Sequence, residues 1–411
     1  MRPAAGTRVM IIGGGFAGLY TALYVSQSAL GKSRKSEIIL LEPRERFLFT
    51  PLLYERLSNE IDWWEIAPTY ERLLLGTGIQ HRSLAVDAID LAERRVIVGD
   101  GSRLPYDYLV LGVGRATALP PIPGLAEHAY SFRTFEDAER LTEKLKFLAA
   151  AERGSAVNIA IIGGGPSGVE LACKISDCFP AKRVRIQLIE QSNWFLSGFN
   201  SPIRQAAQKA LARRAVQIDC GTSLKEVQSK EIKLTVDGKE INRTVDLVIW
   251  AGGTQRQSCL ASLDCEQNEL GQLLTEATLQ LPSDERVFAL GDLAQIKGDN
   301  STPNTAQAAY QAAACAAKNI EALIQGKSLK PFKYKHLGDM LTLGKGGAVL
   351  NSFGLTLTGQ IASAARRFIY VFRLPTRFHR WEVLRHLLQR WGQDFVAGLS
   401  GRKSGRAQRR K

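Results

Sequence analysis

Two stretches of the chain repeat one order of apolar and glycine positions. The first is VMIIGGGFAG, which begins at Val9, and the second is VNIAIIGGGPSG, which begins at Val157. A short run of apolar residues predicts a strand that is buried on both faces. Apolar residues then recur at helical spacing after each glycine cluster. Each stretch therefore predicts a strand, a sharp turn and a helix.

The glycines of both turns follow the spacing G-x-G-x-x-G. They are Gly13, Gly15 and Gly18 in the first turn and Gly163, Gly165 and Gly168 in the second turn. In this spacing the first glycine allows a tight bend, the second lets a pyrophosphate approach the backbone, and the third lets the helix pack closely on the strand. The free N–H groups and the positive dipole end of the helix then face the phosphates. Both turns are predicted to bind phosphate groups.

A further strand follows each helix and ends in an acidic residue. EIILLE ends at Glu42 and RIQLIE ends at Glu190, about where a carboxylate binds a ribose hydroxyl in dinucleotide-binding units. Two chance copies of the whole pattern are far less probable than one. We therefore predict an α/β fold with two Rossmann-like dinucleotide-binding domains.

Each predicted unit is followed by a hairpin and by a buried strand that ends in glycines, at Gly112 and at Gly253. A third such strand stops at Gly291 and Asp292, which places a carboxylate beside a ligand crevice. The predicted division has three parts. These are a first nucleotide domain of residues 1–118 and 285–325, a second of residues 119–284, and a C-terminal segment of residues 326–411.

An alanine-rich helix is predicted over residues 304–323. Gln307 and Gln311 are four residues apart, so both amides lie on one face of this helix. Two interpretations stay open: the glutamines border a ligand site, or they are surface groups on a helix that packs through its alanines.

The composition is that of a soluble globular chain. It has 411 residues, 45% of them hydrophobic, and no run approaches the 18 or so apolar residues of a spanning helix. The first strand begins so early that a signal peptide has no room, so we expect a location in the cytosol or on the cytosolic face of a membrane. The six cysteines follow neither a disulfide framework nor a metal-ligand pattern, and no metal site is predicted. Cys173 and Cys178 are expected to be buried, inert thiols.

The whole of the net charge of +14 lies in residues 326–411, which hold 18 Lys and Arg against three acidic residues. Two helices are predicted there, over residues 361–373 and 376–397. The second has an apolar stripe with arginines beside it, formed by Phe378, Trp381, Leu384, Leu388 and Trp391. Such a helix is typical of an anionic membrane surface. Packing on the core and nucleic-acid binding are alternatives, and the tryptophans disfavour the latter because phosphates need only the arginines.

Here a family resemblance becomes specific. The two glycine turns, FTPLL, WAGG, LGD and AQAAYQ occur in an order that resembles the type II NAD(P)H:quinone oxidoreductases. The resemblance covers about residues 8–350 and departs from the usual ATG pattern at LGVGRAT, so the contacts of residues 112–115 are left open. The overall character is similar to the cyanobacterial and plastid branch, which is linked to prenylated naphthoquinones.

The resemblance implies ligand roles for the motif residues. It implies FAD binding by Gly13, Gly15, Gly18, Glu42 and Asp292, with Thr50 and Pro51 near the isoalloxazine. It implies NAD(P)H binding by Gly163, Gly165, Gly168, Glu190 and Gly253. Glu170 would lie near the nicotinamide, and Gln307 and Gln311 would border the quinone head group.

The implied activity is FAD-dependent oxidation of NAD(P)H coupled to two-electron reduction of plastoquinone or a naphthoquinone, without proton pumping. NADH is the favoured donor because Glu190 would repel the 2′-phosphate of NADPH. The expected enzyme is peripheral, on the cytoplasmic side of a plasma or thylakoid membrane, and a homodimer is possible. Three alternatives stay open: a soluble flavin-dependent disulfide or other NAD(P)H reductase, a sulfide:quinone oxidoreductase, and a non-enzymatic flavin-bearing basic interaction protein.

Overall fold

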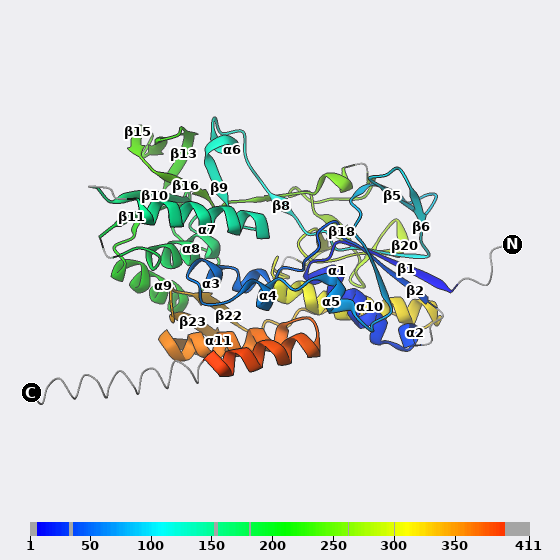
Figure 1. Ribbon diagram of the computed structural model, residues 1–411. Helices are drawn as coiled ribbons and strands as arrows, with labels where there is room; N and C mark the ends of the chain where they lie inside the picture. The colour runs from blue at the N-terminus through cyan, green and yellow to red at the C-terminus, as the bar shows by residue number, and fades with distance from the viewer. Residues whose placement is uncertain are drawn as a thin grey trace, which may run out of the picture.

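Two parallel sheets dominate the structure and lie at its two ends (Figure 1). The structure is a computed structural model that describes residues 6–32, 36–151, 155–180, 182–261, 263–299 and 301–390. The two-domain α/β fold predicted from the repeated pattern is confirmed.

The first sheet has the strand order β19-β20-β7-β1-β2-β3. Its strands are β1 (Thr7–Ile12), β2 (Ser36–Leu41), β3 (Ile79–Arg82), β7 (Tyr108–Leu111), β19 (Gln280–Leu281) and β20 (Asp284–Ala289). All pairs are parallel except β19 with β20. Strand β1 is central, and residues 9–12 are almost completely buried. These residues are all apolar because both faces of the sheet are covered where β1 runs.

The second sheet has the order β12-β11-β10-β16-β9, and every pair in it is parallel. Its strands are β9 (Ala129–Ser131), β10 (Val157–Ile162), β11 (Val184–Ile189), β12 (Gln217–Asp219) and β16 (Leu247–Trp250). Strand β10 has the same central place in this sheet that β1 has in the first. The sequence repeat is therefore a repeat of structure.

Helices α1 (Phe16–Gln27) and α10 (Ala306–Ile324) pack on each other beside the first sheet. Ala309, Ala313 and Ala316 of α10 are buried in the core cluster that includes α1. Alanine side chains let two helix backbones approach closely, which confirms the interpretation of this helix as a packing element. Helices α7 (Phe135–Ala150), α8 (Pro166–Ser176) and α9 (Ser201–Arg213) accompany the second sheet (Figure 1).

Small antiparallel sheets complete each unit. They are β4 (Val86–Asp90), β5 (Arg95–Val98) and β6 (Arg103–Pro105) in the first unit, and β13 (Thr222–Val227), β14 (Glu231–Val236) and β15 (Lys239–Thr244) in the second. Both predicted hairpins are confirmed. Asp237 and Gly238 have φ of 49° and 77°, as a two-residue turn with two left-handed residues requires.

Short elements join these units. Strand β8 (Ala116–Thr117) pairs with β17 (Thr254–Gln255), and β18 (Leu273–Thr275) pairs with β21 (Ala294–Ile296). The short helices are α2 (Ala29–Lys32), η1 (Thr50–Leu52), α3 (Tyr54–Leu57), α4 (Trp63–Ile66), α5 (Tyr70–Leu74), α6 (Leu125–His128) and η2 (Ser258–Leu260).

The C-terminal segment forms a module along the lower edge of the molecule in Figure 1. It consists of the sheet β22 (Asp339–Thr342), β23 (Ala348–Ser352) and β24 (Leu355–Thr358), helix α11 (Gly359–Arg373) and a second helix that is described over residues 377–390. Both predicted helices are present, and Trp391 lies outside the described residues. Of the helices in the described ranges, none has the length and apolar character needed to cross a membrane.

Candidate functional site

The first glycine turn leaves open space at its middle glycine. Gly13 has φ of 95°, and a Cβ on Gly18 would lie 1.7 Å from the carbonyl oxygen of Gly13, so both positions require glycine. A Cβ on Gly15 would meet no atom within 4 Å. Gly15 is also the N-cap of α1, and no side chain caps that helix. Its first N–H groups are therefore available to an anionic ligand.

Glu42 is bound to this turn. Its Oε2 accepts a hydrogen bond from the N–H of Gly14 at 2.7 Å, and its Oε1 accepts one from Arg44 Nε at 2.7 Å. Burial opposes its ionisation, but the hydrogen bonds and charge of Arg44 and the amide of Gly14 outweigh that effect and lower the pKa of Glu42. An ionised acceptor therefore lies beside the first glycine turn.

The second turn repeats this geometry. Gly163 has φ of 115°, a Cβ on Gly168 would lie 1.9 Å from the Gly163 carbonyl oxygen, and a Cβ on Gly165 would meet nothing within 4 Å. Helix α8 begins after Gly165, again without a side-chain cap. Glu190 accepts hydrogen bonds from the N–H groups of Gly164 and Ser192, each at 2.6 Å.

The strands that end in glycines lie against these turns. The N–H of Gly112 donates to Ile12 at 2.8 Å, and the N–H of Ala251 donates to Ile162 at 2.8 Å. A Cβ on Gly163 would lie 3.1 Å from Ala251. Gly253, two residues further on, has φ of 57°. The structure therefore brings the WAGG segment and the second glycine turn together.

The two units meet at the first turn of α8. Tyr54 of α3 donates a hydrogen bond to the hydroxyl of Ser167, which follows the second glycine turn, at 2.9 Å. Thr50 and Pro51 form η1 just before α3, and Asp292 follows β20 at the carboxyl edge of the first sheet. Asp292 lies 3.5 Å from Arg133, which comes from the second unit. These predicted ligand residues thus line the side of the first unit that faces the second.

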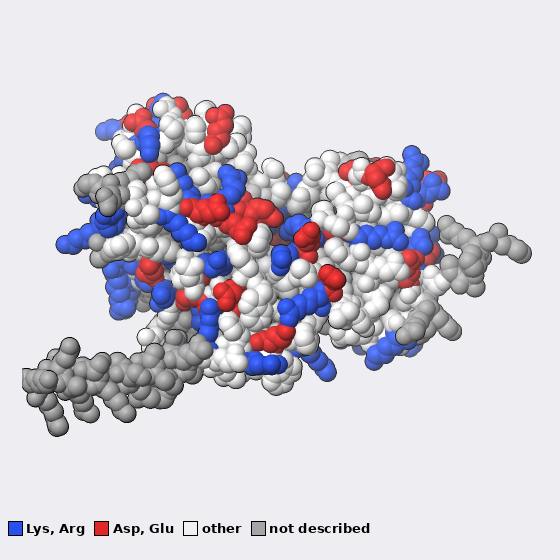
Figure 2. All heavy atoms as spheres, viewed as in Figure 1, with Lys and Arg blue, Asp and Glu red and all other residues white. Residues whose placement is uncertain are grey.

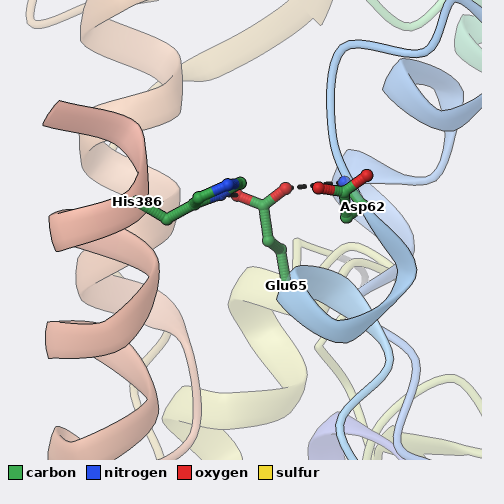
Figure 3. A group of neighbouring side chains, drawn as sticks. All are labelled: Asp62, Glu65 and His386. Atoms are coloured by element: carbon green, nitrogen blue, oxygen red, sulfur yellow. Dashed lines mark hydrogen bonds and ion pairs between the residues drawn. The ribbon is translucent and has the colours of Figure 1, made fainter. Parts of the chain in front are cut away.

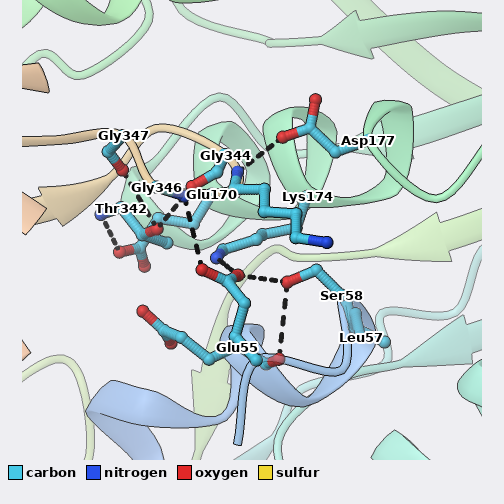
Figure 4. Close-up of polar contacts among 12 residues, drawn as sticks. Glu55, Leu57, Ser58, Glu170, Lys174, Asp177, Thr342, Gly344, Gly346 and Gly347 are labelled. Carbon is cyan, nitrogen blue, oxygen red and sulfur yellow. Dashed lines mark hydrogen bonds and ion pairs between the residues drawn. The ribbon is translucent and has the colours of Figure 1, made fainter. Parts of the chain in front are cut away.

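Glu170 of α8 is buried between three parts of the chain (Figure 4). Its Oε1 accepts the N–H of Thr342 at 2.8 Å and lies 3.7 Å from Arg366 Nη2. Arg366 also pairs with Glu55 and donates to the Pro51 carbonyl oxygen at 2.6 Å. The carboxylate therefore lies where α8, the segment after η1 and the C-terminal module meet.

Burial raises the pKa of Glu170 to about 7, although the charge of Arg366 and the amide of Thr342 lower it. Between about pH 4.5 and 7 the unfolded chain loses a proton that the folded chain keeps, so this group lowers the free energy of unfolding as the pH rises. The difference in stability between Glu170→Gln and wild type is expected to change by about 2.5 kcal/mol in favour of the variant from pH 5 to pH 8. Urea unfolding of both proteins at the two pH values measures this difference, and an unchanged difference would contradict the assigned pKa.

Gln307 and Gln311 contact the segment that follows α10. Gln311 exchanges two backbone hydrogen bonds with Lys335, both 3.0 Å long, and Gln307 Oε1 accepts the N–H of Leu337 at 3.2 Å. Both side chains are half-buried. The amides thus orient residues 334–337, and their place beside a quinone head group stays a prediction.

Reasoning from the sequence missed the buried charges of this junction. Glu55, Lys174 and Arg366 are each no more than 2% exposed, and Lys174 pairs with Glu60 across the two units. One signal was present in the sequence. Arg366 follows Ala362 by four residues, so the two share the inner face of α11, where an arginine needs a buried partner.

The sequence profile of the pyridine nucleotide-disulphide oxidoreductases matches residues 7–313. A demethylphylloquinone reductase, NdbB, from Synechocystis sp. is 40% identical over 92% of this chain and 94% of its own length. The chain belongs to this family, among the type II NAD(P)H:quinone oxidoreductases. The resemblance predicted from the motifs is confirmed.

Other type II enzymes share less identity. An alternative NAD(P)H-ubiquinone oxidoreductase C1 from Arabidopsis thaliana, described as chloroplastic/mitochondrial, is 36% identical over 92% of this chain and 79% of its own length. Among solved structures, NDH2 from Plasmodium falciparum in complex with NADH has a TM-score of 0.80 at 19% identity, covering 92% of this chain and 97% of that one. The sulfide:quinone oxidoreductase from Aquifex aeolicus, with a TM-score of 0.75 at 19% identity, covers 89% of this chain and 91% of that one and shares the fold.

The cysteines of this type II enzyme are free thiols, although its family name refers to disulphides. Burial raises the pKa of Cys173 to about 12 and that of Cys178 to about 11. Since the thiolate is the reactive form, this pair is unsuited to disulfide exchange. Cys173 is buried as predicted, whereas Cys178 is half-buried, and neither offers the thiolate that disulfide exchange requires.

Asp62, Glu65 and His386 form a cluster in which one ligand atom of each lies within 4.8 Å of the others (Figure 3). A cation already faces these acids, because Arg390 lies 3.3 Å from Asp62 and 3.8 Å from Glu65. His386 Nδ1 lies 3.3 Å from Glu65. The cluster binds the helix of residues 377–390 to α4 through ion pairs.

Proposed function

We propose that this type II enzyme binds FAD at the first glycine turn, oxidises NADH at the second, and reduces a membrane quinone. One observation carries the proposal. Both helices that follow the turns begin uncapped beside an open glycine, and in both units a carboxylate accepts the N–H of the neighbouring glycine. This is the geometry that a dinucleotide pyrophosphate and ribose require.

FAD, when bound, supplies hydride acceptance and two-electron transfer to the quinone. The chain supplies binding and orientation. Gly13, Gly15 and Gly18 form the pyrophosphate turn, Glu42 binds a ribose, and Asp292 with Thr50 and Pro51 lies toward the ring end of the site. The donor nucleotide uses Gly163, Gly165, Gly168, Glu190 and Gly253, and Glu170 is proposed to lie beside the nicotinamide.

Glu190 supports a preference for NADH. A carboxylate accepts the 2′-hydroxyl of NADH and repels the 2′-phosphate of NADPH. The nearest sequence candidates for a phosphate partner, Arg183 and Arg185, lie toward the other end of β11, about 15 Å or more from Glu190 along the strand. Arg183 donates to the carbonyl oxygen of Ala151 at 2.9 Å.

The proposed quinone is a naphthoquinone such as a phylloquinone precursor, or plastoquinone. The name of the 40% identical relative supports the naphthoquinone, and that of the Arabidopsis relative supports a benzoquinone. Gln307 and Gln311 are proposed to border the head group. No step of the proposed reaction moves protons across a membrane.

A stopped-flow experiment tests this function. Mixing the purified flavoprotein with NADH is expected to bleach the flavin absorbance quickly, and a short-chain naphthoquinone is expected to restore it quickly. NADPH should react with a lower kcat/KM because of Glu190. Recovery with oxygen alone would contradict quinone reduction, recovery with sulfur compounds would favour the alternatives, and a higher kcat/KM for NADPH would contradict the role of Glu190.

We also propose that the C-terminal module binds an anionic membrane surface. Its outward side chains form an apolar surface in which each member is about half exposed or more: Phe353, Leu355, Ile361, Phe368, Phe372, Phe378, Trp381 and Leu388. Arg377 and Arg385 are exposed among them. Aromatic and basic side chains on one surface are typical of interfacial binding.

The second helix divides its apolar residues between two faces. His379, Val383 and Leu387 are buried against the body, and Leu384 packs partly on the same core. Phe378, Trp381 and Leu388 point outward. Core packing and membrane binding, weighed as alternatives from the sequence, thus use different faces of one helix. Basic and acidic side chains are interspersed over the face shown in Figure 2, which disfavours nucleic-acid binding.

Replacing Phe378 and Trp381 together by glutamate is expected to weaken vesicle binding by at least roughly a hundredfold, because each aromatic side chain contributes about 1.5–3 kcal/mol when it leaves water. Co-sedimentation with phosphatidylcholine vesicles that contain phosphatidylglycerol measures the effect. Trp194→Glu is the matched control, since Trp194 is as exposed as Trp381, at 67% and 68%, but belongs to the second nucleotide unit. An equal loss in the control would contradict the proposed surface.

The division into residues 1–118 with 285–325, 119–284 and 326–411 and a homodimeric state remain proposals. A cytoplasmic-side location on a plasma or thylakoid membrane accords with a module that binds one leaflet.

A further inference from the structure

The turn between β22 and β23 contacts both nucleotide units through its backbone. Its sequence is LGKGG, over residues 343–347, and Gly344 and Gly346 have φ of 98° and 66°. The N–H of Lys345 donates to Asp177 Oδ2 at 2.6 Å, and the N–H of Gly346 donates to Glu60 Oε1 at 3.3 Å. Backbone amides in such a turn form an anion-binding concavity. In this turn the amides donate to two carboxylates of the protein itself, those of Asp177 and Glu60 (Figure 4).

One stripe of α8 faces this turn and the segment after α3. Glu170 accepts the N–H of Thr342, Lys174 pairs with Glu60, and Asp177 accepts the N–H of Lys345. These three residues are four and three positions apart, so they lie on one face of the helix. This face of α8, with its C-cap Asp177, therefore contacts the C-terminal module at two residues and the first unit at one.

We propose that the β22–β23 turn is a positioning element for hydride transfer: it orients helix α8, and with it Glu170 and the second glycine turn, toward the flavin side of the site. The inference rests on the proposed function, because it assigns the nicotinamide to the N-terminal half of α8. An error of about 1 Å in such an orientation costs up to a hundredfold in rate. The turn belongs to the module that carries the proposed membrane surface, so membrane docking and nucleotide orientation share one element.

Gly344 offers a specific test. A Cβ there would lie 2.0 Å from Arg214 Nη2 and 2.4 Å from Asp177 Oδ2, and so would displace the ion pair between these two side chains. Asp177 is the residue that accepts the N–H of Lys345 from this turn. A Cβ on Gly354, in the neighbouring turn between β23 and β24 and also at positive φ, would meet nothing within 4 Å. Gly344→Ala and Gly354→Ala therefore both place alanine at positive φ, at 98° and 80°, but only Gly344→Ala displaces a contact.

In Gly344→Ala we expect the rate constant of flavin reduction at saturating NADH to fall roughly tenfold. The Kd of NADH and the rate of reoxidation by quinone should change less than twofold, and Gly354→Ala should behave as wild type in all three. Equal reduction rates in the two variants would overturn the inference, as would a loss confined to quinone reoxidation.

Thr342→Pro is a second variant, since it removes the N–H that Glu170 accepts, and Thr342→Val is its control. Loss of this donor should raise the apparent pKa in the pH profile of flavin reduction, with no shift in the valine variant. The other titratable groups that act on Glu170 are all retained: Arg366, Glu55, Lys174, Cys173, Tyr54 and Tyr370. An unshifted profile would overturn the inference, whereas an unmodified protein that NADH does not reduce would overturn the proposed function and this inference together.

Discussion

Replacing Gly165 with alanine is expected to weaken NADH binding roughly tenfold to a hundredfold while leaving the melting temperature unchanged. The added Cβ meets no protein atom within 4 Å, and Gly165 has φ of −71°, which alanine adopts freely. The fold therefore does not require glycine at position 165. A methyl group in the space of the pyrophosphate costs the complex about 1–3 kcal/mol.

Calorimetric titration with NAD⁺, which has the same pyrophosphate as NADH but does not reduce the flavin, measures the binding. Differential scanning calorimetry of the same sample measures the melting temperature. Gly168→Ala is the matched control, because its Cβ would lie 1.9 Å from the Gly163 carbonyl oxygen and should lower the melting temperature as well. Gly15→Ala is expected to weaken the binding of FAD in the same way that Gly165→Ala weakens the binding of NADH. Normal nucleotide binding by Gly165→Ala would show that the open space is not the pyrophosphate site.

Replacing Arg366 with methionine is expected to lower the free energy of unfolding by about 3–5 kcal/mol. Arg366 is 2% exposed and is the cation that pairs with Glu55, which is also 2% exposed. Its guanidinium also lies 4.9 Å from the centre of the Tyr370 ring. Removing Arg366 leaves the carboxylates of Glu55 and Glu170 without their main counter-charge, and their burial keeps water from hydrating them.

Urea unfolding measures this loss. Arg72→Ala is the control, because Arg72 pairs with Glu382 at the surface, is 43% exposed, and should contribute less than about 1 kcal/mol. The double variant Glu55→Leu with Arg366→Met should recover part of the stability, since it removes the unpaired charge at position 55. A similar loss for the Arg366 and Arg72 variants would contradict the buried network.

The ion pairs of Arg366 and Lys174 have a common consequence. Arg366 of α11 pairs with Glu55 and Glu170, so it joins the C-terminal module to both nucleotide units by buried charge. Lys174 of α8 pairs with Glu60 and joins the two nucleotide units directly. Buried pairs demand specific geometry from both partners. The module is therefore an integral part of the site and also the proposed membrane-binding surface.

The sequence by itself determined the two nucleotide units. The apolar runs before Gly13 and Gly163 predicted central buried strands, and the glycine spacing predicted turns whose first and third glycines are sterically required. These features are local: a tight turn and a close strand-helix contact involve neighbouring residues. Residue type and spacing alone are enough to predict local requirements of this kind.

Only the tertiary structure decided what surrounds Glu170. Its partners, Thr342 and Arg366, follow it by more than 170 residues, and no periodicity relates them. The same holds for Gln307 and Gln311, whose common face the spacing predicted but whose contacts with residues 335 and 337 it did not. The outward and inward faces of the helix at residues 377–390 were likewise ambiguous, because apolar residues occur on both. Burial of a charge depends on which distant segments meet around it, and that depends on how the whole chain packs.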